Sequence, residues 1–149
     1  MIIPEKMPVL FVGHGSPMNA IEDNRFSRKW QELASQIPKP KAILSISAHW
    51  VTEGSHVNNQ AHPKTIYDMY GFPQELYQLV YEPPGAPDLA NQVIALLGDI
   101  TTVDNQWGVD HGTWSVLNHM FPNADIPTMQ LSIDANATME EHFHIGRKL

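Results

Sequence analysis

The fold is decided by Lys41-Ala42-Ile43-Leu44-Ser45-Ile46-Ser47, a mostly apolar segment that indicates a buried strand of a parallel sheet. Residues 24–37, upstream of it, carry apolar side chains at helical spacing and are followed by Pro38, which ends a helix. Further upstream, Pro8-Val9-Leu10-Phe11-Val12 is another apolar run, which stops at Gly13. Strand, helix and strand in this order form a βαβ unit, so the sequence predicts an α/β fold.

The rest of the chain continues this alternation of helices and strands. The pattern predicts one domain over residues 1–149, with a mostly parallel sheet flanked by helices on both faces. Thr138 and Glu141 have the spacing of a capping box, which starts the last helix. The further elements that we expect are a long polar loop at 51–71, a short helix at 73–80, a helix at 87–97, a strand at 100–103, a helix at 114–120, a strand at 127–133 and a helix from 138 towards 149.

Composition excludes several classes of function. The net charge is −7 and no basic run exists, so nucleic acid and anionic membrane surfaces are poor partners. The chain has no cysteine, which excludes disulfides, thiolate metal sites and a cysteine nucleophile and fits a cytoplasmic location. Met1 to Met7 contains charged residues and no long apolar run, so we expect no signal peptide. No segment approaches the roughly 20 apolar residues that span a bilayer.

Two histidines occupy matching positions after the first two predicted strands. His14 follows the first strand between two glycines, and His49 follows the second. In open α/β sheets, ligands bind beyond the carboxyl ends of the strands. Neutral imidazole is a good ligand for zinc and iron, so the pair predicts part of a metal site. The alternative is that each histidine caps its strand end through hydrogen bonds.

A third histidine, His111, precedes a predicted helix in a glycine-containing loop. It is a candidate active-site acid, base or substrate donor. The alternative is a capping loop around two tryptophans. Asp110 has the position to orient the ring of His111 or to cap the helix. We expect His62 to be a solvated loop residue, and His56 and His119 to be surface or packing residues.

Aromatic residues gather in the same parts of the sequence. Trp50 and Tyr67 belong to a group that could line a substrate pocket, although aromatic residues in such numbers often form only core. Other catalytic signatures are missing from the sequence. It contains no Gly-x-Ser-x-Gly elbow, no P-loop and no Gly-x-Gly-x-x-Gly.

Several motifs in order carry a resemblance that covers essentially the whole chain. They are Leu10-Phe11-Val12-Gly13-His14-Gly15-Ser16-Pro17-Met18-Asn19, Ser47-Ala48-His49-Trp50, Thr65-Ile66-Tyr67-Asp68, Gly71-Phe72-Pro73, Trp107-Gly108-Val109-Asp110-His111-Gly112-Thr113-Trp114 and Pro127-Thr128-Met129-Gln130-Leu131-Ser132-Ile133. This series resembles the class III extradiol ring-cleavage dioxygenases, in the 4,5-DOPA extradiol dioxygenase branch.

The resemblance implies a function and a set of roles. The family inserts both atoms of O2 into a catechol ring at a non-haem Fe(II), and members of this branch are also described with Zn(II), one metal per site. By resemblance, His14 and His49 are metal ligands and His111 is a catalytic histidine near substrate and O2. Trp50, Tyr67 and Asp110 are the expected substrate-binding residues.

The length of the chain departs from the family. The family domain is considerably longer, and its remaining metal ligands, including a histidine in a His-Asn motif, come from a C-terminal half without counterpart here. We therefore expect a truncated fold, the N-terminal half of such a domain, whose exposed edge favours a homo-oligomer or the missing half as partner. Two alternatives to a dioxygenase stay open. They are an inactive metal-binding remnant and a metal-dependent hydrolase on the same histidines.

Overall fold

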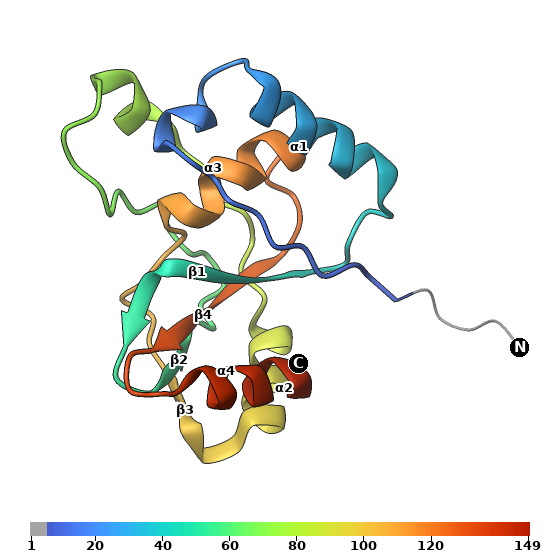
Figure 1. Ribbon diagram of the computed structural model, residues 1–149, viewed down its shortest axis with the longest axis vertical. Helices are drawn as coiled ribbons and strands as arrows, with labels where there is room; N and C mark the ends of the chain where they lie inside the picture. Colours follow the sequence, from blue (N-terminus) through green and yellow to red (C-terminus); the bar gives the residue numbers. More distant parts are fainter. Residues whose placement is uncertain (1–5) are drawn as a thin grey trace, which may run out of the picture.

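A four-stranded sheet with the order β1-β4-β2-β3 forms the centre of the computed structural model, which describes residues 6–149 (Figure 1). The strands are β1 (Ile43–Thr52), β2 (Ser55–Val57), β3 (Thr101–Val103) and β4 (Thr128–Asp134). The pairs β1–β4 and β2–β3 are parallel, and β2–β4 is antiparallel. The predicted mostly parallel sheet is therefore confirmed. Most of the segment for which we expected no signal peptide, residues 1–5, lies outside the described residues.

Helices cover both faces of the sheet, as predicted. The helices α1 (Arg25–Gln36) and α3 (His111–Met120) lie on one side in Figure 1, and α2 (Pro87–Leu97) and α4 (Met139–Lys148) lie on the other. Short 3-10 helices connect them at η1 (Pro17–Ala20), η2 (Gln74–Gln78) and η3 (Gly98–Ile100). Within residues 6–149, no helix has both the length and the apolar character needed to cross a membrane.

Local sequence explains where the helices begin. Asn24 caps α1, its side chain accepting from the backbone of Ser27 while the Ser27 side chain accepts from the backbone of Asn24. Thr138 and Glu141 form the predicted capping box of α4. Trp30 on α1 is buried against α3, with Leu33 and Ile37 partly buried beside it, whereas Phe26 at the start of the helix is 47% exposed.

The predicted first strand is wrong. Residues 8–12 run as an extended segment towards η1 but make no strand pairing. Val9 is 99% exposed and Phe11 is fully exposed, whereas Val12 packs against the α1–α3 cluster. The run alternates as a strand would, but β1 is an edge strand and its outer edge gives this segment no ladder of hydrogen bonds.

Three further boundaries differ from the prediction. The strand β1 continues to Thr52, so His49 lies inside it rather than beyond its end. The expected loop at 51–71 contains β2 and a bridge between Thr65 and Val109. The helix α3 begins at His111, three residues earlier than predicted, because Asp110 caps it.

Candidate metal centre

Three histidines from distant parts of the chain form one cluster. His14 comes from the loop before η1, His49 from β1 and His111 from the first turn of α3. One ligand nitrogen from each lies within 4.8 Å of the other two. The structure therefore brings together the two predicted metal ligands and the predicted catalytic histidine. Among residues 6–149, no carboxylate oxygen joins this cluster.

The closest contact joins His14 and His49, whose Nε2 atoms lie 2.8 Å apart. In β1, the register with β4 shifts between Ile46 and Val51, so the strand is irregular where His49 projects from it. His14 approaches through a tight turn in which Gly15 has a φ of +63°. A Cβ at Gly15 would lie 3.0 Å from the Asn19 side chain, so a side chain there would be both strained and crowded.

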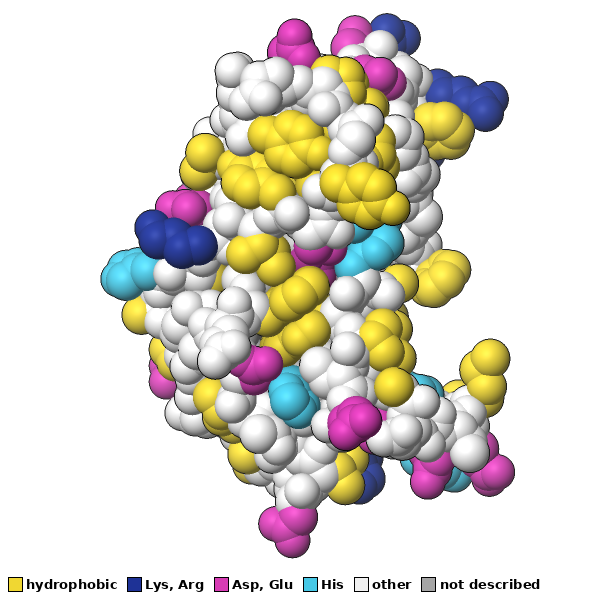
Figure 2. Space-filling model, turned by 90° about the vertical axis from the view of Figure 1, so that its left-hand side faces the viewer, with side chains coloured by type: hydrophobic (Ala, Val, Ile, Leu, Met, Phe, Trp, Pro, Cys, Tyr) yellow, Lys and Arg dark blue, Asp and Glu magenta, His cyan; other side chains and the backbone are white. Residues whose placement is uncertain are grey.

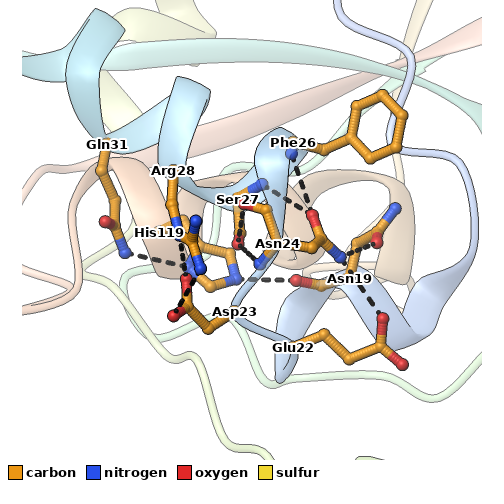
Figure 3. Close-up of polar contacts among 9 residues, drawn as sticks. All are labelled: Asn19, Glu22, Asp23, Asn24, Phe26, Ser27, Arg28, Gln31 and His119. Carbon is orange, nitrogen blue, oxygen red and sulfur yellow. Dashed lines mark hydrogen bonds and ion pairs between the residues drawn. The ribbon is translucent and has the colours of Figure 1, made fainter.

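Asn19 fixes the turn that carries His14. Its side-chain Nδ2 donates to the backbone oxygen of His14 at 2.9 Å. Its Oδ1 accepts from the Asn24 side chain at 2.7 Å, and its backbone oxygen lies 2.7 Å from Nε2 of His119. Figure 3 shows how Asn19, Asn24 and His119 link the first turn of α1 to η1 and α3. The position of His14 therefore depends on a polar network of side chains outside the cluster.

Close packing between α3 and β1 brings His111 to the same point. The rings of His49 and His111 have centroids 3.8 Å apart. Gly112 permits this approach, because a Cβ there would lie 2.5 Å from Oγ of Ser47 and 2.8 Å from Cδ2 of His49. Only a residue without a side chain fits between the helix and the strand at this position.

The other face of His111 meets a carboxylate that sequence reasoning did not select. Asp68 accepts a hydrogen bond from the backbone N–H of His111 at 2.9 Å, and its Oδ2 lies 2.8 Å from Nδ1 of the ring. The ring N–H is not directed at Oδ2, so this second contact is a close polar contact rather than an aligned hydrogen bond. Both side chains are largely buried, at 7% exposure for His111 and 11% for Asp68.

Burial affects the protonation of these groups. Desolvation, followed by the nearby His111 and His49, holds the pKa of His14 below its ordinary value. For Asp68, burial alone would raise the pKa, but the hydrogen bonds and the charge of His111 outweigh it, and the pKa is lowered. A lowered His14 pKa favours neutral imidazole, the form that ligates metals.

These residues fit a metal ion. The Nδ1 of His14 is buried and has no hydrogen-bond partner, while its Nε2 points at His49. Because two imidazole nitrogens at 2.8 Å can share only one proton between them, a cation at this point would satisfy both lone pairs. The cluster could hold a metal through nitrogen ligands and leave coordination positions open.

The predicted substrate-binding residues lie in different environments. Trp50 is 3% exposed and stacks on Trp107, so its ring is packed within the core. Asp110 is fully buried and has protein partners for both oxygens, from the Thr113 backbone, Trp107 and Gln130. The carboxylate of Asp110 therefore caps α3 in this structure, as the helix-capping alternative describes.

Tyr67 keeps an accessible position. It is 38% exposed, and its ring lies 6.3 Å from Trp114, whose ring in turn lies 6.2 Å from His111. Figure 2 views the side of the molecule on which β1 ends, and hydrophobic side chains gather there next to histidine and acidic side chains. An aromatic surface thus borders the cluster.

The remaining predicted histidines lie outside the cluster. His62 is an exposed loop residue, as expected. His56 faces Asp104 at 3.5 Å, and His119 belongs to the Asn19 network. Asp68 and Asn19 were missed because an acid in a loop and an amide in a turn have no spacing signature. Both lie inside the motifs that carry the family resemblance, which was the available signal.

Nearly the whole chain is similar to known proteins. Residues 8–149 match the family described as "Catalytic LigB subunit of aromatic ring-opening dioxygenase". A relative from Escherichia coli (strain K12), named "4,5-DOPA dioxygenase extradiol", is 51% identical over 97% of this chain and 54% of its own length. A relative of the same name from Beta vulgaris is 44% identical over 93% of this chain and 54% of its own length.

A solved structure is also similar to this chain. The crystal structure of an uncharacterized protein from Escherichia coli K12 has a TM-score of 0.79 and 46% identity to this chain. The match covers 97% of this chain and 54% of that one. The chain spans about half the length of the curated relatives it matches.

Proposed function

This chain belongs to the family of catalytic LigB subunits of aromatic ring-opening dioxygenases, and we propose that it contributes the histidine cluster of an extradiol catechol dioxygenase. The observation that carries the proposal is the convergence of His14, His49 and His111 within 4.8 Å. Among the described residues, these are the only three His, Asp or Glu side chains that meet in this way.

The substrate that we propose is a catechol such as DOPA, with O2 as the second substrate. The names of the relatives from Escherichia coli and Beta vulgaris support this choice. We propose Fe(II) as the metal, with Zn(II) as the alternative occupant. When bound, such a metal holds the two substrates side by side, which makes an intermolecular reaction effectively intramolecular.

We assign the protein's own roles from the geometry of the cluster. His14 and His49 hold the metal through their facing Nε2 atoms. His111 takes a proton from a catechol hydroxyl at Nε2, because its Nδ1 faces Oδ2 of Asp68 at 2.8 Å. Tyr67 is 38% exposed and lies beside Trp114, and it borders the space for the aromatic ring of the substrate. This assignment leaves Trp50 and Asp110 to support the site from the core.

The same proposal includes a partner at the exposed edge of the sheet, strand β1. The relatives extend well beyond the region that this chain matches, and extradiol chemistry usually requires three protein ligands. We propose that either the remaining part of such a domain or a second copy of this chain adjoins β1. Metal binding without turnover is the second candidate function. It is favoured because the Nε2 atoms of His14 and His49 converge, while no carboxylate of residues 6–149 joins the cluster.

The test is an anaerobic reconstitution. The chain is loaded with Fe(II), mixed with DOPA and exposed to air, and a yellow semialdehyde product is followed by absorbance. We expect product from the wild type, none from His14→Ala, and none from a metal-loaded His111→Ala variant. The Escherichia coli relative, tested in parallel, shows that the conditions permit ring cleavage.

The outcomes separate the candidates. Stoichiometric metal with no product, under conditions in which the relative works, would replace the enzyme proposal by the metal-binding one. Hydrolysis of an ester by the loaded chain without O2 would instead support a metal-dependent hydrolase. Loss of metal from His111→Ala would make His111 a third ligand rather than the acid–base residue.

A further inference from the structure

We infer that Asp68 is a positioning residue that fixes the tautomer and the ring orientation of His111. This inference rests on the proposed function, because it assigns how the proposed acid–base residue is held ready. It concerns one carboxylate on the segment between β2 and η2 and one imidazole at the start of α3.

Asp68 holds His111 at two points. Its Oδ1 accepts from the backbone N–H of His111 at 2.9 Å, and its Oδ2 lies 2.8 Å from the ring Nδ1. His111 is the first residue of α3, so its backbone N–H has no acceptor within the helix. A carboxylate at this point is also favoured by the partial positive charge of a helix N-terminus. The main chain and the ring are therefore held by the same group.

An ionised carboxylate decides the tautomer because it can only accept hydrogen bonds. Although the ring N–H is not aligned with Oδ2, an unprotonated Nδ1 would place its lone pair 2.8 Å from an anionic oxygen, which repels it. The contact therefore favours N–H at Nδ1 of His111 and a lone pair at Nε2. A lone pair at Nε2 is what a proton acceptor needs. The opposite tautomer would present an N–H to the substrate and could not accept its proton.

Asp68 is distinct from the other acid at the site. The oxygens of Asp110 accept hydrogen bonds from the Thr113 backbone at the start of α3, from Trp107 and from Gln130. Among the ion pairs of residues 6–149, only that of Asp68 includes a histidine of the cluster. Both of its oxygens contact His111, and neither belongs to the group of ligand atoms that His14, His49 and His111 form. It acts through His111 and does not touch the substrate.

The test replaces the carboxylate by an amide of the same shape. In Asp68→Asn, the amide oxygen can still accept from the His111 backbone, so the NH2 group faces Nδ1 and favours the tautomer with N–H at Nε2. The metal-free full chain is labelled with 15N in its histidines, and two-bond 1H–15N correlations at about pH 8 identify each neutral tautomer. We expect His111 with N–H at Nδ1 in the wild type and at Nε2 in the variant.

Kinetics of the Fe(II)-loaded chain supply the second readout. We expect kcat for ring cleavage to fall at least about 100-fold in Asp68→Asn while KM changes little, because a wrongly protonated histidine still permits binding. Asp104→Asn is the matched control, since Asp104 faces His56 at 3.5 Å and lies outside the cluster. It should alter neither the His111 signals nor kcat.

Each result has a defined consequence. A wild-type His111 with N–H at Nε2 would overturn the inference without any variant, even if Asp68→Asn failed to fold. An unchanged tautomer and kcat in folded Asp68→Asn would overturn it as well. If the wild type performs no ring cleavage, the proposed function fails, but the NMR result still decides whether Asp68 sets the tautomer.

Discussion

The Nε2 atoms of His14 and His49 lie 2.8 Å apart, although the two residues are separated by 35 positions in the sequence. This approach is enforced from both sides. The turn at Gly15 and the side chain of Asn19 hold His14, and the N-terminus of α3 packs against β1 beside His49. Two imidazoles held in this way are preorganised for a shared cation, because their ordering cost is already met by the fold.

Asn19→Ala should weaken metal binding without removing a ligand. The variant loses the bond to the His14 backbone oxygen and the acceptor for Asn24, so the turn becomes free to move. Loss of such supporting partners typically costs about 10- to 100-fold in metal affinity. The measurement is a competition titration of Zn(II) against a chromophoric chelator.

Asn118→Ala is the matched control for Asn19→Ala. It removes one hydrogen bond, from the side-chain amide of Asn118 to the backbone oxygen of Ala20. This bond lies next to the same network but does not contact His14. Its affinity for Zn(II) should stay within about twofold of the wild type. Equal losses in both variants would show that general stability, rather than the His14 turn, controls binding.

Gly112→Ala should both destabilise the chain and disturb the cluster. Its Cβ would lie 2.5 Å from Oγ of Ser47 and 2.8 Å from Cδ2 of His49, so α3 must move away from β1. Overpacking of this kind costs about 1–3 kcal/mol, which urea unfolding measures. Gly146→Ala, on α4 with open space around it, should instead stabilise by roughly 0.5–1 kcal/mol. Equal unfolding midpoints for the two variants would contradict the packing described for α3.

Tyr81 should make stability depend on alkaline pH. Burial, and to a lesser degree the charge of Asp125, raises the pKa of Tyr81 above its ordinary value. The folded state therefore favours the neutral phenol, whose contribution is complete below about pH 10 and is lost as the pH rises further. Urea unfolding of the wild type at about pH 8 and about pH 10.5 should show this loss.

Tyr81→Phe tests the source of that dependence. It should cost about 1 kcal/mol at neutral pH, because the hydroxyl donates to the Phe121 backbone oxygen at 3.0 Å. It should also flatten the alkaline loss. Tyr70→Phe, at a residue 92% exposed, should do neither. An alkaline loss that persists unchanged in Tyr81→Phe would assign it to another group.

The outer edge of β1 should make the purified chain associate with a second copy. Val9 and Phe11 expose their side chains almost completely, and β1 is the edge strand of the sheet. Sedimentation velocity over a concentration series should show a dimer that weakens in a Val9→Ser and Phe11→Ser double variant. Val80→Ser, exposed elsewhere, serves as control. A monomer at every concentration would remove the second copy as a partner of this edge.

Local patterns predicted most of the fold. The helices α1, α2 and α4 follow from apolar spacing and from signals that act within a few residues, such as Pro38 after α1 and the capping box at Thr138. The 8–12 segment has the composition of a buried strand, but a strand also needs a neighbour, and pairing is a long-range property. The same reason explains why β2, with one bridge to β4, was not predicted.

The candidate site was predictable only in part. His14 and His49 carry a signal because each stands near the end of an apolar run, where α/β folds bind ligands. The assignment of Trp50 and Asp110 to a substrate surface depended on burial, which the sequence does not contain. Asp68 contacts His111 because its loop folds back onto the start of α3, although the two residues are 43 positions apart in the sequence. Such contacts become visible only when the tertiary structure is known.

The central claim is that His14 and His49 bind one metal ion, and calorimetric titration of the metal-free chain with Zn(II) tests it most directly. We predict one ion per wild-type chain, no stoichiometric binding by His14→Ala or His49→Ala, and unchanged binding by His62→Ala, whose histidine is exposed in a loop. Stoichiometric Zn(II) retained by both His14→Ala and His49→Ala would contradict the account.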